Sequence, residues 1–171
     1  MDIIKNTIRD VPDFPIPGII FKDITPVLLN PEAFAACVEG FAERYRDMKI
    51  DVIAAVESRG FLFGAPLAKE LGIGMAIVRK PGKLPGDTIE TSYDLEYGSA
   101  TLQLHKDAVQ PGQRVLVIDD LLATGGTAAA AGSLIAQLGG EVVEQAFVVE
   151  LSFLAGRKAL GDVPIFALVT Y

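Results

Sequence analysis

Two acids and a glycine turn follow a short apolar run within residues 115–127. The run 115–118 predicts a buried strand, and the Ala-rich stretch 127–138 predicts a helix. The turn between them, Thr-Gly-Gly-Thr at 124–127, contains glycines that allow backbone N–H groups to point into one concavity. The first N–H groups of the helix and the positive end of its dipole face the same point. The turn therefore predicts a site for an anion such as a phosphate group.

The neighbouring carboxylates, Asp119 and Asp120, repel phosphate and therefore call for hydroxyl donors or a cation. A ribose diol meets this requirement. Because adjacent side chains of a strand face opposite ways, both acids reach one sugar only if the strand ends there. The alternative is that the acids end an ordinary strand and the glycines form an ordinary turn. The coincidence of strand, acid pair and anion-binding turn favours a phosphosugar site.

Apolar runs alternate with helical patterns along the rest of the chain. Strands are predicted at 52–56, 74–78, 114–118, 142–150 and 164–170, and helices at 31–47, 60–71 and 127–138. Segments 88–93 and 100–104 predict a β-hairpin-like excursion. This order predicts an α/β fold with a mostly parallel twisted sheet flanked by helices. Ligands of such sheets bind outside the carboxyl ends of the strands.

The stretch 115–127 resembles the phosphoribosyl-pyrophosphate signature of the type I phosphoribosyltransferases. Four further blocks narrow the resemblance to members that act on adenine: 13–27, 57–64, 79–86 and 95–98. The resemblance covers nearly the whole chain. It implies transfer of the 5-phosphoribosyl group from phosphoribosyl pyrophosphate to adenine, which gives AMP and pyrophosphate. It also implies an N-terminal hood (roughly residues 1–30), a core (roughly 31–171) and a flexible β-hairpin-like lid (roughly 79–100).

The resemblance implies roles for individual residues. Phosphoribose would be bound by Asp119, Asp120, Ala123, Thr124, Gly125, Gly126 and Thr127. Pyrophosphate would be bound by Glu57, Ser58, Arg59, Arg79, Lys80 and Lys83. Adenine would be bound by Ile20, Phe21 and Lys22. Glu96 would exchange a proton with adenine, and Tyr97 would pack near the reaction centre.

The loop 57–60 is expected to bind pyrophosphate through backbone amides and the charge of Arg59. The family implies a cis peptide here, between Glu57 and Ser58. The alternative is that Arg59 lies at a helix start for surface pairing.

Segment 79–88 carries three cations, two prolines and two glycines, and its small apolar area predicts mobility. Its composition suits a plain solvated loop, whereas the resemblance implies a flap over pyrophosphate, within one chain or across a dimer.

The hood is expected to recognise the base. Its residues Pro12, Pro15, Pro17 and Gly18 predict a fixed segment without regular secondary structure. In the family an aromatic residue such as Phe21 stacks on adenine while neighbouring backbone groups read its edge. A backbone carbonyl accepts from a 6-amino group and would face another acceptor in a 6-oxopurine. By itself, Phe21 could equally belong to the hydrophobic core.

Two other functions are consistent with the signature. One is transfer to a 6-oxopurine or to orotate, but the 6-oxopurine enzymes use a lysine on a strand after the signature, and the predicted strand 142–150 contains none. The other is a non-catalytic sensor of phosphoribosyl pyrophosphate. Such repressors carry an added DNA-binding domain, and because the blocks quoted above begin at residue 13, none is expected here.

Composition limits the partners. With 171 residues, half of them hydrophobic, the chain is expected to form a single domain over residues 1–171. A net charge of −7 argues against nucleic acid as a partner.

The lone Cys37 is expected in the core, and His105, the only histidine, is expected in a strand and not as a base. No signal peptide or membrane span is recognised, so a cytoplasmic location is expected. Mg²⁺, carried mainly by the donor, and a homodimer complete the expectations.

Overall fold

A five-stranded parallel sheet forms the centre of the molecule. The computed structural model describes residues 1–94 and 99–171. The strands of this sheet are β3 (Val52–Val56), β4 (Gly74–Val78), β7 (Arg114–Leu122), β8 (Glu141–Glu150) and β9 (Ile165–Thr170). They are ordered β4-β3-β7-β8-β9, and every neighbouring pair is parallel. The main helices are α3 (Pro31–Tyr45), α4 (Gly60–Leu71) and α5 (Gly126–Gln137). The predicted α/β sheet is therefore confirmed.

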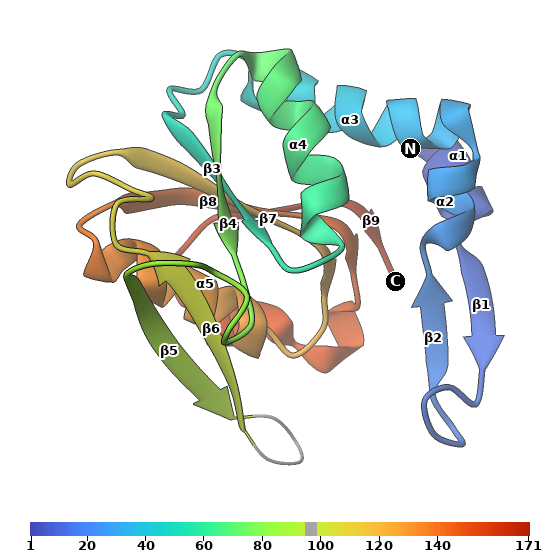
Figure 1. Cartoon of the computed structure of the whole chain (residues 1–171). Coiled ribbons are helices and arrows are strands. Elements are labelled where there is room, and N and C mark those ends of the chain that lie inside the picture. Colours follow the sequence, from blue (N-terminus) through green and yellow to red (C-terminus); the bar gives the residue numbers. More distant parts are fainter. Residues whose placement is uncertain (95–98) are drawn as a thin grey trace.

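Alternate residues of the central strands pack into two apolar layers. In β3, Ile53 and Ala55 belong to the buried cluster that contains α3 and α4, whereas Ala54 and Val56 belong to the cluster that contains α5. Because successive side chains of a strand point to opposite faces, an uninterrupted apolar run can serve both layers. Figure 1 shows α3 and α4 on one side of the sheet and α5 on the other. With both faces covered, the strand ends are left as places for a site.

Capping residues define two of these helices locally. The Asn30 side chain accepts hydrogen bonds from the N–H groups of Glu32 and Ala33, at 3.0 and 3.1 Å, at the start of α3. The helix α4 ends at Gly72, whose φ of +69° continues the chain in the left-handed conformation. Three residues separate β3 from α4 and two separate α4 from β4, so that α4 connects the two parallel strands.

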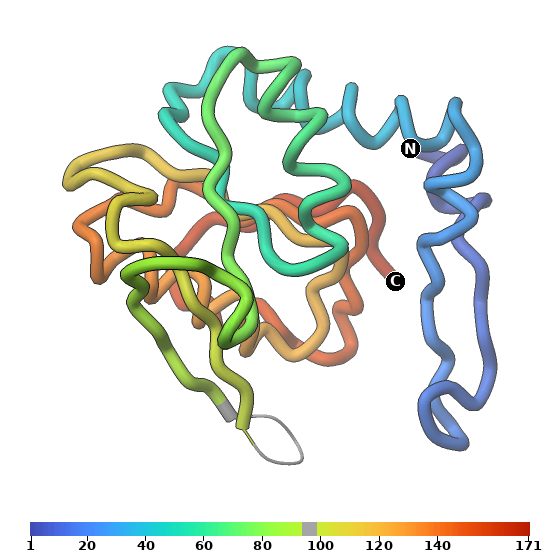
Figure 2. The backbone as a smooth tube through the Cα atoms, in the orientation of Figure 1, coloured from blue at the N-terminus to red at the C-terminus, as the bar shows by residue number. Residues whose placement is uncertain are grey.

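The hood contains regular secondary structure, contrary to the prediction from its prolines. It consists of α1 (Asp2–Thr7), β1 (Arg9–Pro12), β2 (Ile20–Asp23) and α2 (Thr25–Leu29), and β1 pairs antiparallel with β2. The prediction is wrong because Pro12 is the last residue of β1, and Pro15 and Pro17 lie in the connecting loop, where they interrupt no ladder. Figures 1 and 2 show this hairpin standing beside the central sheet.

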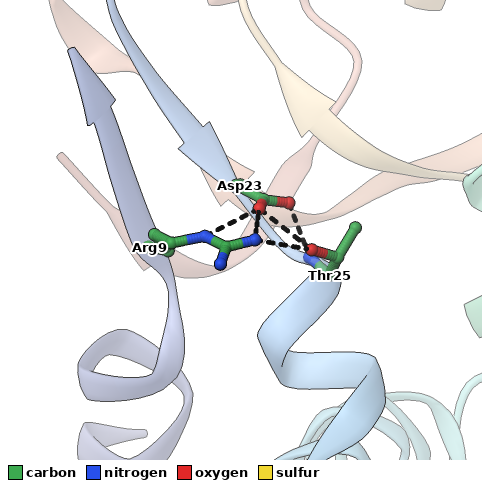
Figure 3. A network of polar contacts seen from close by, with 3 residues as sticks. All are labelled: Arg9, Asp23 and Thr25. Carbon is green, nitrogen blue, oxygen red and sulfur yellow. Dashed lines mark hydrogen bonds and ion pairs between the residues drawn. The ribbon is translucent and has the colours of Figure 1, made fainter.

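One ion pair fastens the base of the hood hairpin (Figure 3). The Arg9 guanidinium donates to Asp23 Oδ2 from Nε at 3.1 Å and from Nη2 at 2.5 Å. Asp23 Oδ1 accepts the backbone N–H of Thr25 at 2.9 Å. The hydrogen bonds from Arg9 and Thr25 lower the pKa of Asp23. The Asp23 carboxylate thus joins β1, β2 and the start of α2.

The lid forms the predicted hairpin, with β5 (Thr88–Asp94) antiparallel to β6 (Ser99–His105). The segment before β5 lies along β6. The backbone of Arg79 exchanges hydrogen bonds with that of Gln103, at 2.9 and 2.6 Å, and the Gly82 N–H donates to Gln103 Oε1 at 3.1 Å. Polar contacts with β6 therefore hold this segment, while its mobility stays a prediction.

Two features, the length of β7 and a pair of short helices, differ from the prediction or extend it. The strand β7 continues to Leu122 instead of ending at Ile118, because its pairing with β8 extends to Leu122 and Glu150. Two short 3₁₀ helices, η1 (Ser152–Leu154) and η2 (Gly156–Leu160), were not predicted. Cys37 lies in the core as expected, and burial raises the pKa of its thiol to about 12. In the described part of the chain, no helix combines the length and apolar character needed to cross a membrane.

Candidate active site

A cavity of about 390 Å³ opens at the carboxyl ends of β3 and β7. It is lined by residues 57–59 and 119–128, together with Lys80, Tyr93 and Leu102. The strands β3 and β7 are neighbours, but the chain continues from β3 to β4 on one side and from β7 to β8 on the other. Loops that leave such a reversal point diverge, and the crevice between them is where open α/β sheets bind ligands. The cavity thus brings the acid pair, the glycine turn and loop 57–59 together.

The turn at 124–127 depends on one glycine in the left-handed conformation, not two. Gly125 has a φ of +88°, whereas Gly126 is already the first residue of α5. A Cβ on Gly125 would overlap the carbonyl oxygen of Gly156 and lie 2.9 Å from the Ala159 Cβ. Glycine is therefore required here by backbone conformation and by contact with η2. Residues 124–128 line the cavity, so the unpaired N–H groups at the start of α5 are available to an anion there.

The helix η2 supports this turn from behind. A Cβ on Gly156 would overlap the Ala123 carbonyl oxygen, so the two segments touch through their backbones. Arg157 secures η2 to the end of β8 by two hydrogen bonds to the buried Glu150, at 2.6 and 2.7 Å. These hydrogen bonds lower the pKa of Glu150. This support was not predicted; its signal in the sequence is an acid, Glu150, at the end of an apolar strand, followed by the pair Gly156-Arg157.

The two acids have different surroundings although both line the cavity. Asp120 is 5% exposed and accepts a hydrogen bond from Arg59 Nε at 2.5 Å. Asp119 Oδ1 accepts the backbone N–H of Asp120 at 2.8 Å. Burial, and then the charge of Asp120, raise the pKa of Asp119 well above its usual range. The expectation that β7 ends at the acids is wrong; both reach the cavity although β7 continues, because its pairing with β3 stops at Ile118.

The loop 57–60 contains the predicted cis peptide between Glu57 and Ser58. It passes close to β7, since a Cβ on Gly60 would lie 2.7 Å from the Ile118 carbonyl oxygen. Arg59 precedes α4 and pairs with the buried Asp120, so the alternative of surface pairing is wrong. Burial opposes the charge of Arg59, but the hydrogen bond and charge of Asp120 outweigh it and raise the pKa of Arg59. A fixed positive charge thus stands at the cavity wall.

Of the three lid cations, Lys80 alone lines the cavity. Arg79 donates from Nε to Glu57 at 3.2 Å and from Nη1 to the Lys83 carbonyl oxygen at 3.3 Å. The Glu57 carboxylate also accepts the backbone N–H of Lys80 at 2.8 Å. Burial would raise the pKa of Glu57, but the hydrogen bonds from Lys80 and Arg79 lower it. Glu57 thus fastens the start of the lid to loop 57–60.

The profile of the family described as "Phosphoribosyl transferase domain" matches residues 25–162. The chain belongs to the phosphoribosyltransferase family. An adenine phosphoribosyltransferase of Chloroflexus aurantiacus is 55% identical over 168 residues, which are 98% of this chain and 97% of that protein. The crystal structure of adenine phosphoribosyltransferase from Thermoanaerobacter pseudethanolicus has a TM-score of 0.96 at 54% identity and covers 99% of both chains. That from Saccharomyces cerevisiae, complexed with an imino-altritol bisphosphate and adenine, has a TM-score of 0.93 at 44% identity, over 98% of this chain and 97% of that chain.

In this phosphoribosyltransferase the three residues expected to bind adenine lie on β2, outside the cavity lining. Ile20 is exposed, and the half-buried Phe21 has its ring edge-on to Phe14, with centroids 5.1 Å apart. Lys22 Nζ lies 4.0 Å from the centroid of the Tyr171 ring. Among the described residues, none of the buried apolar clusters includes Phe21, so the alternative of a core role is wrong.

Glu96 and Tyr97 fall in residues 95–98, outside the described residues. The strand before them contributes a residue that sequence analysis missed. The Tyr93 hydroxyl lies 3.0 Å from Thr127 Oγ1, at the edge of the glycine turn, and Tyr93 lines the cavity. Its place three residues before Glu96 is the only sequence signal for it. The lid thus contributes Tyr93 of β5 to the site as well as Lys80 of the segment before β5.

Proposed function

We propose that this protein transfers the 5-phosphoribosyl group from phosphoribosyl pyrophosphate to adenine and gives AMP and pyrophosphate, a purine-salvage reaction. The cavity at β3 and β7 carries this proposal, because it combines a helix start open to anions, two acids and a fixed arginine. The choice of acceptor is supported by the relatives, which are adenine phosphoribosyltransferases, and by the Saccharomyces cerevisiae complex, which contains adenine.

The donor would extend across the cavity. Its 5′-phosphate would lie in the turn 124–127, against the first N–H groups of α5. Asp119 and Asp120 would accept hydrogen bonds from the ribose hydroxyls beside it. Loop 57–59, Lys80 and the other lid cations would bind the pyrophosphate. Because Asp120 already holds Arg59, little side-chain freedom would be lost when the donor binds.

Mg²⁺ would be carried mainly by phosphoribosyl pyrophosphate and water. Among the described residues, no group of three or more His, Cys, Asp or Glu side chains is placed to hold a metal. The site nevertheless suits a cation, since the half-buried Asp119 carboxylate beside Asp120 has a raised pKa and a nearby positive charge would stabilise its ionised form. Bound there, Mg²⁺ would offset the charge that pyrophosphate gains as it leaves.

The hood and the lid would supply the acceptor half of the reaction. Phe21 would stack on adenine, and backbone groups of Ile20 and Lys22 would read its 6-amino edge. Pyrophosphate leaves C1 of the ribose, and N9 of adenine attacks that carbon. Glu96 would exchange the proton with adenine, while Tyr97 packs near the reaction centre. Closure of the lid would exclude water from the activated sugar.

We further propose that residues 1–171 act as a single domain and that the enzyme is a cytoplasmic homodimer. The resemblance to the family supports both statements. Size-exclusion chromatography with light scattering tests the dimer, and a mass equal to one chain would contradict it.

An acceptor panel tests the activity. The purified protein is mixed with Mg²⁺, phosphoribosyl pyrophosphate and one of adenine, hypoxanthine, guanine, xanthine or orotate, and nucleotide formation is followed by chromatography. We expect AMP from adenine and at least about 10²-fold less product from the other bases. More product from a 6-oxopurine or from orotate would show that adenine is not the acceptor. Binding of phosphoribosyl pyrophosphate without any nucleotide formation would favour the non-catalytic sensor.

A further inference from the structure

Two hydrogen bonds join the lid strand β5 to α5, the helix that begins at the glycine turn. The Tyr93 hydroxyl lies 3.0 Å from Thr127 Oγ1, and Gln137 Nε2 donates to Thr91 Oγ1 at 2.6 Å. Thr91 and Tyr93 are two residues apart in β5 and therefore share one face of the strand. Tyr93 also packs against the buried cluster that contains α5. Hydrogen bonds near both ends of α5, at Thr127 and at Gln137, thus hold the strand against the helix.

The contact at Thr127 has only one possible direction when its hydroxyl binds a phosphate group. Each hydroxyl has a single proton to donate. A phosphate dianion only accepts, so the Thr127 hydroxyl donates to it and can only accept from Tyr93. A phenol is also a stronger hydrogen-bond donor than an aliphatic alcohol, which favours the same direction. In the presence of phosphate, Tyr93 is therefore the donor of this hydrogen bond and Thr127 Oγ1 the acceptor.

We propose that Tyr93 is a positioning residue for the donor: its hydroxyl donates to Thr127 Oγ1 and directs the Thr127 proton into the turn. This inference rests on the proposed function, because it places the 5′-phosphate of phosphoribosyl pyrophosphate in that turn. Hydrogen bonds in a chain strengthen one another, so removal of the first weakens the second. Tyr93 acts in this way through Thr127 and without contact to the phosphate.

Tyr93→Phe tests the inference, because the ring is retained and the contact between Thr91 and Gln137 still holds β5 on α5. By isothermal titration calorimetry we expect ribose 5-phosphate to bind about three- to tenfold more weakly, the effect of one hydrogen bond. The KM for phosphoribosyl pyrophosphate should rise by a similar factor, while the KM for adenine stays at the wild-type value. Wild-type affinity for ribose 5-phosphate in this variant would overturn the inference.

A double-mutant cycle shows whether Tyr93 acts through Thr127. The single variants Tyr93→Phe and Thr127→Val and the double variant are titrated with ribose 5-phosphate. We expect the double variant to bind no more weakly than Thr127→Val alone, since the second hydroxyl then has nothing to direct. Losses that multiply would show that Tyr93 acts elsewhere and would overturn the inference.

Thr91→Val is the matched control. It removes the other contact between β5 and α5 and leaves the turn untouched, so wild-type affinity for ribose 5-phosphate is expected. A loss equal to that of Tyr93→Phe would show that docking of the strand matters, not the direction of a proton, and would overturn the inference. If the wild type makes AMP but Tyr93→Phe binds normally, the inference fails alone. If the wild type makes no AMP from adenine and phosphoribosyl pyrophosphate, the proposed function fails with it.

Discussion

The donor half and the acceptor half of the proposed site differ in how the fold holds them. The donor half, residues 119–127 with loop 57–60, lies at the ends of central strands and is fixed by the buried Asp120 and by backbone contact with η2. The hood hairpin is fastened by Arg9, whose side chain is 61% exposed, to Asp23. The Asp23 side chain is 14% exposed, but its partner is largely solvated, and such a pair contributes only modestly to stability. The donor site is therefore part of the core, whereas the elements expected to recognise the base are attached at the periphery.

This difference separates the expected effects of mutation. Changes in the donor half should alter donor affinity and stability together, because the same contacts serve both. Changes in the acceptor half should alter turnover or base affinity while the free energy of unfolding stays nearly constant. A change in the acceptor half that lowers donor affinity or stability, or a change in the donor half that alters only base affinity, would contradict this division.

The largest effect is expected for Glu96→Gln in the acceptor half. Loss of the group that exchanges the proton with adenine should lower kcat by about 10²- to 10⁴-fold, while the Kd for phosphoribosyl pyrophosphate stays at the wild-type value. Steady-state kinetics and calorimetry measure the two quantities. Glu43→Gln, an exposed position on α3, is the control and should retain full activity. Unchanged kcat in Glu96→Gln would remove Glu96 from the mechanism.

Gly156→Ala should displace the turn at 124–127 through its contact with η2. The added Cβ would overlap the Ala123 carbonyl oxygen, so η2 or the turn has to move. We expect the free energy of unfolding to fall by about 2–3 kcal/mol and donor affinity to fall by roughly 10²-fold. Urea denaturation and calorimetry test this. Gly74→Ala, where an added Cβ has no neighbour within 4 Å, should change neither quantity. Normal donor affinity in Gly156→Ala would show that η2 does not support the turn.

Phe21→Ala should act on the base alone. Loss of a stacked ring is expected to raise the KM for adenine by about tenfold, with the donor KM unchanged. Because Phe21 lies outside the buried clusters of the described residues, the free energy of unfolding should change by less than about 1 kcal/mol. Phe153→Ala, which removes an exposed aromatic side chain outside the hood, is the control and should leave the KM for adenine unchanged. An equal rise for both substrates would contradict the division between the halves.

The smallest effect is expected for Asp119→Asn in the ligand-free protein, which should become slightly more stable while it binds the donor less well. Burial and the charge of Asp120 raise the folded-state pKa of Asp119, so the unfolded chain loses this proton at a lower pH than the folded protein, which lowers the free energy of unfolding. This destabilisation is absent below the unfolded value of 3.8, grows as the pH rises toward the folded pKa, and is constant above it.

Thermal melts between about pH 4 and pH 8 check this prediction. The Tm of Asp119→Asn should exceed that of the wild type by a few degrees near neutral pH, and the difference should shrink toward pH 4. The exposed Asp47→Asn is the control for loss of one charge. A Tm difference that does not depend on pH would contradict the assignment to ionisation of Asp119.

The parts of the fold predicted correctly are those with strong local signals. The strands β3 and β4 and the helix α4 have the predicted bounds, because their apolar runs and the glycine at the helix end act within a few residues. The secondary structure of the hood was predicted wrongly, because Pro12 falls at the end of β1 and Pro15 and Pro17 fall in a loop, and local composition does not show where a ladder stops. The length of β7 depends on its neighbours, since β8 continues to pair with it after β3 has ended.

The sequence by itself determined the alternation of strands and helices and the left-handed turn at Gly125 on which the proposed anion site depends, because apolar spacing and the missing Cβ of Gly125 act locally. Only the tertiary structure decided that Arg59 pairs with Asp120, that η2 supports the turn and that Tyr93 reaches Thr127. These contacts join residues that lie 61, about 30 and 34 positions apart in the chain. Such pairs form where packing of the sheet brings strand ends and loops together, and no local pattern encodes that distance.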